Sequence, residues 1–194
     1  MKTIYLIVGS IGSGKSSFGK DFFANKNIEY ISTDCYKKLF FDYYGHDLLK
    51  GYHKGDLLVQ YKLEKNCKNN SDLIYEICPT NIDKINFIKY LLKTYNYKIV
   101  SFIIGTDDVN ININRGKARY NLEGGDPVSE EKVTSRYYTT MTNLSIILNI
   151  SNKTYFIDNS IKIKKIAYFE NNTMHIFAHN IWFDEFVVNK INKI

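Results

Sequence analysis

The sequence is short of the features that mark membrane, disulfide-rich and zinc-binding proteins. No apolar run approaches the roughly 20 residues of a membrane-spanning helix, and the first apolar run is too brief for a secretory signal. Cysteine occurs only at Cys35, Cys67 and Cys78, without C-x-x-C spacing, so we expect free thiols in a reducing compartment. The four histidines lack metal-ligand spacing. These absences predict a cytoplasmic protein without a membrane anchor.

Long basic runs and arginine-rich tails are also missing, although the net charge is +6. The charge fits an anionic ligand such as a nucleotide, and it permits loose nucleic-acid binding. Because the cations are not gathered in one stretch, nucleic acid is a poor candidate for the partner. With 194 residues, 44% apolar and 24% charged, the composition predicts one folded domain, residues 1–194, with a sizeable core.

The clearest motif is a phosphate-binding loop, Gly9-x-x-x-x-Gly14-Lys15-Ser16. It follows a buried-strand pattern at residues 3–8 and precedes a helix expected from Lys15, which is the context that the motif requires. Phe18, Phe22 and Phe23 are expected on the core face of this helix. The glycines let backbone N–H groups converge on phosphates, and the helix adds its positive end. We expect Lys15 to bridge the β- and γ-phosphates and Ser16 to ligate Mg²⁺. The expected nucleotide-binding residues are Gly9, Ser10, Ile11, Gly12, Ser13, Gly14, Lys15, Ser16 and Ser17.

Strand and helix patterns alternate along most of the chain. We predict strands at 3–8, 28–31, 72–77, 98–105 and 153–160, and helices from about 15, at 81–94, from about 108 and at 129–148. The pattern at residues 164–178 predicts a hairpin that turns at Asn171-Asn172, and the pattern at 182–191 predicts a last helix. The alternation is typical of a doubly wound, mostly parallel α/β sheet with helices on both faces. Together with the phosphate loop, it predicts the P-loop NTPase fold.

Two segments are harder to assign. Residues 42–70 are polar and interrupted by glycines, with one helix expected inside them, and we interpret them as a cap insertion over the site. Residues 108–148 predict two helices joined by the turn "EGGDPV", the second capped by Ser129. Such a helix pair can form a lid over a bound nucleotide.

Acidic and hydroxyl side chains follow three of the predicted strands. They are Ser32, Thr33 and Asp34; Glu76 and Thr80; and Thr106, Asp107 and Asp108. Ligands of open α/β sheets bind beyond the carboxyl ends of the strands, so we expect these groups to face the phosphate loop. A carboxylate there can accept a hydroxyl proton or hold Mg²⁺ through water. For Asp34 and Glu76 we favour such a role, and for Asp108 we favour a helix cap.

Three arginines flank the Gly-Gly turn: Arg115, Arg119 and Arg136. Arginines on a lid can neutralise charge on a transferring phosphoryl group, because the guanidinium binds phosphate through two nitrogens. The alternative is that they lie on solvated helix faces. Their scarcity in a lysine-rich chain favours the functional interpretation.

Several stretches together resemble the zeta-toxin family of phosphate-loop kinases. They are "GSIGSGKSSF", "YISTDCYKKLFF", "YEICPTNIDKINFIK" and "NINRGKARYNLEGGDPVSEEKVTSRYYTTMTNL", followed by "YFIDNS". The resemblance implies ATP- and Mg²⁺-dependent phosphorylation of a small-molecule hydroxyl, and in zeta toxins the acceptor is UDP-N-acetylglucosamine. It implies that Asp34 is the base and that Glu76, with Thr80 nearby, lies on the substrate side. Arg119 and Arg136 are the best matches for the phosphate-contacting arginines, with Arg115 in reserve.

The chain departs from the family pattern at the turn and just after it. It reads Gly124-Gly125-Asp126-Pro127-Val128 where zeta-like members usually read Gly-Gly-His-x-Val-Pro, and Thr139 stands where many carry a second arginine. These departures concern the acceptor more than the ATP site. A lone chain gives no basis for toxicity or for an antitoxin partner.

Three functions therefore stay open, in this order. The first is an ATP-dependent kinase of a small molecule, with a nucleotide-sugar as the acceptor that the resemblance implies. The second is an ATPase or nucleotide-binding module that acts through a protein partner, with Asp34 positioning water. The third is a polynucleotide kinase or RNA-binding protein, which rests only on the positive charge. The Asn-Lys-x-Asp motif that reads guanine is absent, which favours ATP over GTP.

Overall fold

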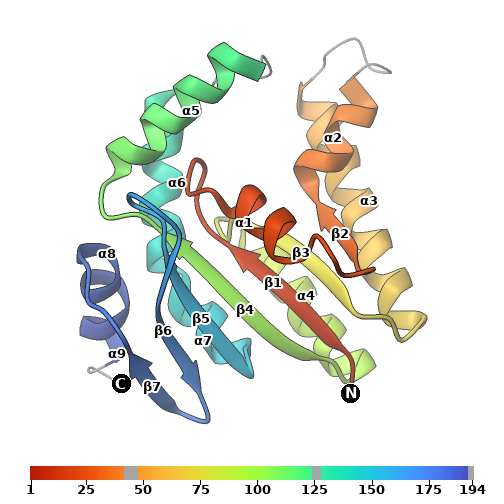
Figure 1. Ribbon diagram of the computed structural model, residues 1–194. Helices are drawn as coiled ribbons and strands as arrows, with labels where there is room; N and C mark the ends of the chain where they lie inside the picture. The colour runs from red at the N-terminus through yellow and green to blue at the C-terminus, as the bar shows by residue number, and fades with distance from the viewer. Residues whose placement is uncertain (42–47, 124–127, 192–194) are drawn as a thin grey trace.

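The protein is described by a computed structural model that covers residues 1–41, 48–123 and 128–191, and it is built on a seven-stranded sheet (Figure 1). The strands are β1 (Thr3–Val8), β2 (Glu29–Ser32), β3 (Leu73–Ile77), β4 (Lys98–Gly105), β5 (Lys153–Asp158), β6 (Lys164–Glu170) and β7 (Thr173–Ile176). The longer helices are α1 (Lys15–Phe22), α2 (Thr33–Phe41), α3 (Leu48–Lys68), α4 (Ile82–Tyr95), α5 (Val109–Glu123), α6 (Glu130–Thr142) and α7 (Leu144–Ile150). The chain continues as α8 (Ile181–Phe183), a π-helical turn (Asp184–Val188) and α9 (Asn189–Ile191).

The sheet has the order β2-β3-β1-β4-β5-β6-β7. The first five strands run parallel, and β6 and β7 are antiparallel additions at one edge. The predicted α/β class, the mostly parallel sheet and the C-terminal hairpin with its following helix are therefore confirmed. Because β1 lies between β3 and β4, the loop that follows it leaves the middle of the sheet, where the carboxyl ends of its neighbours surround it.

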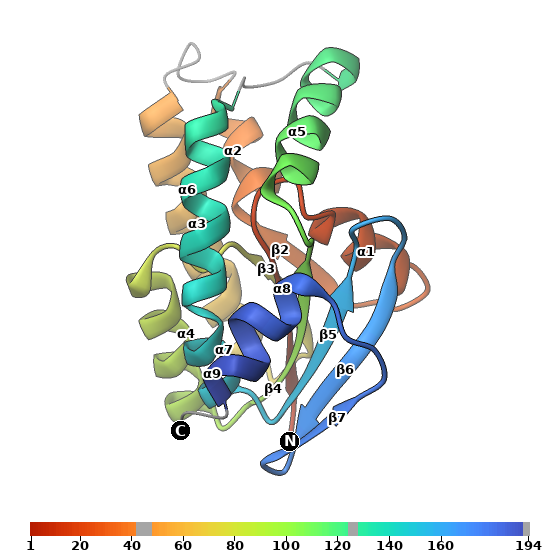
Figure 2. The same cartoon turned by 90° about the vertical axis from the view of Figure 1, so that its left-hand side faces the viewer.

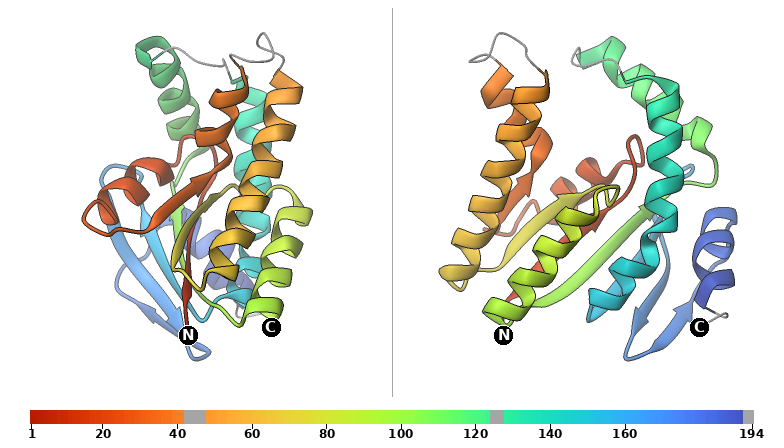
Figure 3. Two further views of the ribbon diagram at one scale, coloured as in Figure 1. Left: turned by 90° about the vertical axis from the view of Figure 1, so that its right-hand side faces the viewer. Right: turned by 180° about the vertical axis from the view of Figure 1, so that it is seen from behind.

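Helices cover both faces of the sheet, as expected, but unequally (Figures 2 and 3). On one face α1 places Phe18 and Phe23 against Ile7 and Phe102. On the other face α4, α6, α7 and the C-terminal helices pack in a larger core, and Trp182 is fully buried there. Fully burying side chains of this size contributes about 1.5–3 kcal/mol each, so the larger core dominates the stability of the fold.

Most of the expected local structure is present. The strands at 3–8 and 98–105 match residue for residue, and the side chain of Ser129 accepts a hydrogen bond from the backbone N–H of Lys132, as a helix cap does. Asn171 and Asn172 both have positive φ angles, which are those of a tight hairpin turn. All three cysteines are free, as predicted.

Two expectations about helices are corrected. The helix expected over 129–148 is divided at Asn143, whose side-chain amide donates to the carbonyl of Pro79 and ties the break to the segment that follows β3. Phe22, expected in the core with Phe18 and Phe23, is 51% exposed. It lies on the last turn of α1 and packs its ring against Phe18 and Phe102 from the solvent side.

The two segments that were hard to assign form helical arms beside the carboxyl ends of the strands (Figure 1). Within 42–70, α3 occupies residues 48–68 and packs along α2, while residues 42–47 lie outside the described residues. Within 108–148, α5 and α6 form the second arm, and the Gly-Gly turn at 124–127 likewise lies outside them. No helix in the described ranges is long and apolar enough to cross a membrane.

Candidate functional site

The phosphate loop connects β1 to α1 across residues 9–14. Gly12 and Gly14 have φ angles of +75° and +87°, which side-chain-bearing residues rarely adopt. Gly14 directly precedes α1, and its carbonyl accepts the N–H of Phe18, so the helix starts at the loop itself. The backbone N–H groups of the first turn are therefore presented where an anion would bind.

Glu76 is placed against the phosphate loop by β3, next to β1. Glu76 is 7% exposed, and its carboxylate accepts a hydrogen bond of 2.9 Å from the hydroxyl of Ser16. The ammonium of Lys15 lies 3.5 Å from the same carboxylate oxygen and 3.5 Å from the carbonyl of Ser10. The sequence resemblance implied a place on the substrate side for Glu76, and in the structure one of its carboxylate oxygens contacts the two phosphate-loop residues.

The oxygens of Ser16 and Glu76 form a donor set that suits a hard divalent cation. A hydroxyl and a carboxylate 2.9 Å apart, beside the expected phosphate position, are the ligand types that Mg²⁺ takes directly or through water. The residues present therefore fit the Mg²⁺ that a phosphate-loop enzyme uses.

Tyr30, which the sequence did not single out, holds the second oxygen of Glu76. Its hydroxyl donates to that oxygen at 2.5 Å, from the middle of β2. Burial, reinforced by the negative charge of Glu76, raises the pKa of Tyr30 well above its ordinary value. The phenol is consequently a stable donor, and it fixes the carboxylate in one orientation.

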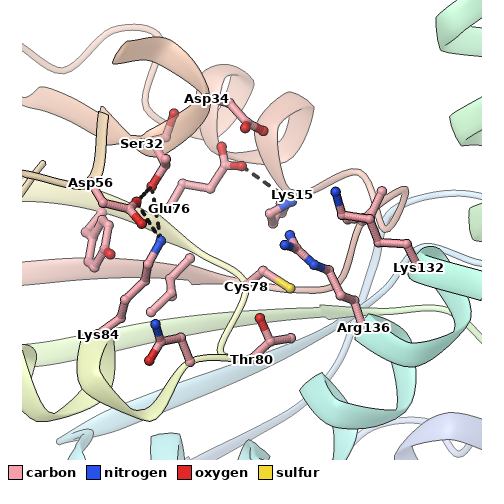
Figure 4. A pocket seen from close by; sticks show the side chains of 15 residues that line it. Lys15, Ser32, Asp34, Asp56, Glu76, Cys78, Thr80, Lys84, Lys132 and Arg136 are labelled. Atoms are coloured by element: carbon pink, nitrogen blue, oxygen red, sulfur yellow. Dashed lines mark hydrogen bonds and ion pairs between the residues drawn. The ribbon is translucent and has the colours of Figure 1, made fainter. Parts of the chain in front are cut away.

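A cavity of about 570 Å³ opens beside this cluster (Figure 4). Its walls come from the start of α1, the β2–α2 junction, α3, the end of β3, the start of α4, and α6. The predicted site residues that line it are Ile11 and Lys15 at the phosphate loop, Asp34, Glu76, Thr80 and Arg136. The structure thus brings residues from five separate elements or junctions to one space.

Asp34 and Arg136 reach the cavity from different helices, α2 and α6. Asp34 lies exposed in the first turn of α2, at the rim, whereas Arg136 projects from α6, partly buried, on the side of Lys15 (Figure 4). Lys132, one turn before Arg136 on the same helix, joins them and was not predicted. A carboxylate in a cavity that also holds the cations Lys15, Lys132 and Arg136 can orient a hydroxyl toward a phosphoryl group.

The other two predicted arginines lie elsewhere. Arg119 is exposed on α5 and is not among the described residues that line the cavity. Arg115, on the same helix, donates to the carbonyl of Ser160 at 3.3 Å, after β5. Their assignment to phosphate contacts stays a prediction.

The acids after β4 do not reach the cavity. The carboxylate of Asp108 accepts the N–H of Asn110 and caps α5, as favoured from the sequence. Asp107 accepts the backbone N–H of Trp182, so its expected position facing the phosphate loop is wrong. The helix near the C-terminus that carries Trp182 therefore binds the carboxylate of Asp107. No sequence pattern related that helix to the end of β4.

The far end of the cavity holds a second polar cluster, of which only Thr33 was expected from the sequence. Asp56 of α3 forms an ion pair of 2.7 Å with Lys84 of α4 and accepts the hydroxyl of Thr33 at 2.7 Å (Figure 4). These residues lie 23 and 28 positions apart in the chain. No motif marks Asp56, since only the packing of α3 against α2 and α4 brings it to the cavity.

Comparison with known proteins gives a family and a fold. A family model described as "Zeta toxin" matches residues 1–181, and no curated protein sequence matches the chain. A chain of the AvrRxo1-ORF1:ORF2 complex with ATP superposes with a TM-score of 0.71 at 11% identity, over 98% of this chain and 63% of that one. This chain therefore spans less than two thirds of that larger protein.

Two further solved structures share the fold at low identity. A chain of the PezAT toxin–antitoxin system of Streptococcus pneumoniae matches with a TM-score of 0.60 and 17% identity, over 84% of this chain and 71% of that one. The deoxyadenosine kinase of M. mycoides with bound dATP matches with a TM-score of 0.51 and 16% identity, over 82% and 91%. At these identities the likeness concerns the arrangement of the chain, which is that of P-loop kinases.

Proposed function

The chain belongs to the zeta toxin family, and we propose that it is an ATP- and Mg²⁺-dependent phosphotransferase that acts on a hydroxyl of a small molecule. One observation carries the proposal. Lys15, Asp34 and Arg136, expected from the sequence to act on the phosphate, on the acceptor and on the transferring group, line a single cavity at the phosphate loop.

The proposed chemistry divides between the two sides of the cavity. The phosphate loop binds the nucleotide phosphates, and Lys15 moves from its contacts with Glu76 and Ser10 to the β- and γ-phosphates. Arg136 neutralises the charge that develops on the transferring group. Asp34 accepts the proton of the acceptor hydroxyl and orients it for in-line attack. Mg²⁺, held by Ser16 and by Glu76 directly or through water, would supply charge neutralisation at the phosphates.

We further propose a nucleotide-sugar as the acceptor, following the family resemblance. The size of the cavity and its two clusters of charge support an acceptor that is larger than a simple alcohol and polar at both ends. The departures at the Gly-Gly turn make the acceptor the first thing to test. ATP and UDP-N-acetylglucosamine, then a metabolite extract, form the substrate series.

The test of the reaction is the substitution Asp34→Asn. We expect ATP affinity to stay within about twofold, because Asp34 lies outside the phosphate-loop motif, and transfer to fall by about 10²-fold or more, the usual contribution of a general base. The measurements are Mg-ATP binding by calorimetry and phosphorylated product by mass spectrometry. Asp21→Asn, on an exposed position of α1, is the matched control. Normal transfer by the Asp34 variant would remove the base assignment.

The competing function is nucleotide hydrolysis coupled to a protein partner. The PezAT structure concerns a toxin–antitoxin system, which motivates a search for an antitoxin-like partner. ADP release separates the two functions, because a kinase releases ADP in proportion to added acceptor whereas an ATPase does so without it. Acceptor-independent release at the full rate would favour the competing function.

A further inference from the structure

Two asparagines from different parts of the chain hold the phosphate loop by its carbonyl groups. Asn112, in the first turn of α5, is fully buried, and its amide nitrogen donates to the carbonyl of Ile11 at 2.7 Å and to the hydroxyl of Ser10 at 2.8 Å. Asn159, directly after β5, donates to the carbonyl of Ser13 at 2.8 Å. The two amides therefore bind two carbonyl groups on a loop of six residues.

The positions of these carbonyls decide where the loop N–H groups point. In a planar trans peptide the C=O and the N–H of the next residue point in opposite directions. Drawing the Ile11 carbonyl toward Asn112 therefore turns the N–H of Gly12 away from Asn112. The Ser13 carbonyl and the N–H of Gly14 are related in the same way. A phosphate loop works only if such N–H groups converge on the anion.

The glycines and the asparagines also fit each other in space. A Cβ on Gly12 would lie 2.4 Å from the backbone oxygen of Asn112, and a Cβ on Gly14 would lie 2.3 Å from the amide nitrogen of Asn159. Each positive-φ glycine is thus in contact with the asparagine that binds the carbonyl before it. The absence of a side chain at these glycines permits the close approach as well as the backbone angle.

Asn112 is itself fixed by the surrounding structure. Its amide oxygen accepts the hydroxyl of Thr106, at the end of β4, so the amide nitrogen is committed to the loop. The carbonyl of Thr106 in turn accepts the hydroxyl of Tyr137 on α6, the helix that carries Arg136. The loop is therefore tied through buried hydrogen bonds to both helices of the predicted lid.

We propose that Asn112 and Asn159 are positioning residues that direct the N–H groups of Gly12 and Gly14 toward the nucleotide phosphates. They act through the loop carbonyls and do not touch the nucleotide. The inference rests on the proposed function in one respect, namely that the loop binds a nucleotide. It adds two residues outside the phosphate-loop motif to the binding machinery.

The test replaces the donor without changing the shape of the side chain. Asn112→Asp keeps the acceptor for Thr106 but places a carboxylate oxygen against the Ile11 carbonyl. We expect the Kd for Mg-ATP to rise about tenfold or more at pH 8, the effect of an unpaired buried polar group. At pH 5.5 we expect the Kd of the variant to lie closer to that of the wild type. A buried carboxyl group that faces a carbonyl becomes protonated at this pH, and its O–H can donate to the Ile11 carbonyl again.

Matched variants separate positioning from folding. Asn114→Asp makes the same change on an exposed position of α5, and its Kd should stay within about twofold of wild type. Asn159→Asp, at a partly exposed site, should weaken binding in the same direction as Asn112→Asp. Thermal unfolding is measured for each variant, and if Asn112→Asp does not fold, Asn159→Asp carries the test.

The outcomes are distinct. Weaker Mg-ATP binding by a folded variant, with recovery at low pH for Asn112→Asp, supports the inference. Wild-type affinity at pH 8 in a folded Asn112→Asp or Asn159→Asp protein overturns it and leaves the proposed function standing. A wild-type protein that binds no Mg-ATP overturns the proposed function and this inference together.

Discussion

The two ends of the cavity are built in different ways. At the phosphate end, Lys15 and Ser16 belong to one contiguous motif, and β3 adds Glu76 from the neighbouring strand. At the far end, Thr33, Asp56 and Lys84 come from three helices. The phosphate end is supported by backbone geometry, whereas the far end depends on how helices pack. This difference teaches that the motif of the phosphate end can be recognised in the sequence, whereas the far end, the proposed acceptor site, is assembled only by tertiary structure.

The largest effect is expected from removing Lys15, at the phosphate end of the cavity. We expect Lys15→Ala to lower phosphoryl transfer by on the order of 10³-fold, because a preorganised cation at the developing charge is lost. Lys20→Ala, exposed in the last turn of α1, is the control. Transfer rates at saturating ATP and acceptor measure the effect. A loss under tenfold would show that the phosphate end does not depend on its local motif.

A smaller effect is expected at the far end. Asp56→Asn removes the ion pair with Lys84 at the proposed acceptor end. We expect the acceptor KM to rise about tenfold, because the proposed acceptor would lose a charged partner there, while the Kd for Mg-ATP stays unchanged. The stability change should stay below about 1 kcal/mol, since both partners are partly solvated. A change in nucleotide affinity instead would contradict the separation of the two ends.

The smallest effect concerns Tyr30. Tyr30→Phe removes one hydrogen bond to Glu76, and we expect the Mg²⁺ concentration for half-maximal activity to rise about threefold, the net value of one such bond. Tyr61→Phe, whose ring is 58% exposed, is the control. An unchanged Mg²⁺ requirement would show that Ser16 and Lys15 hold Glu76 in place without Tyr30.

The same variant has a second readout at high pH. The folded-state pKa of Tyr30 is raised above the unfolded value of about 10, so its stabilising contribution is complete below pH 10 and is lost as pH rises further. In urea unfolding between pH 9 and pH 11, the wild type should therefore lose more stability than Tyr30→Phe. Equal losses in the two proteins would show that Tyr30 is not the group that titrates.

The sequence predicted the fold and the phosphate end for a physical reason. Strand hydrophobicity, the order of strand and helix patterns and the glycine spacing are local properties, and they identified β1, β4 and the loop correctly. The parts that could not be predicted depend on side chains that meet only after folding. Asp56 carries no local signal, and Asn112 and Asn159 bind the loop from 101 and 146 residues away. Asp107 was misplaced because its partner, Trp182, lies 75 residues later.

Trp182 also restricts where acid chemistry can take place. Its backbone N–H is bound to Asp107 and its indole N–H to Asp158, while its ring lies where a side chain on Gly105 would otherwise go. The carboxylates that end β4 and β5 are thus already engaged by the C-terminal helix. The family match stops at residue 181, one position before this tryptophan. A protein shortened to that boundary would lose both N–H donors of Trp182, so Asp107 and Asp158 would need water or other groups in their place.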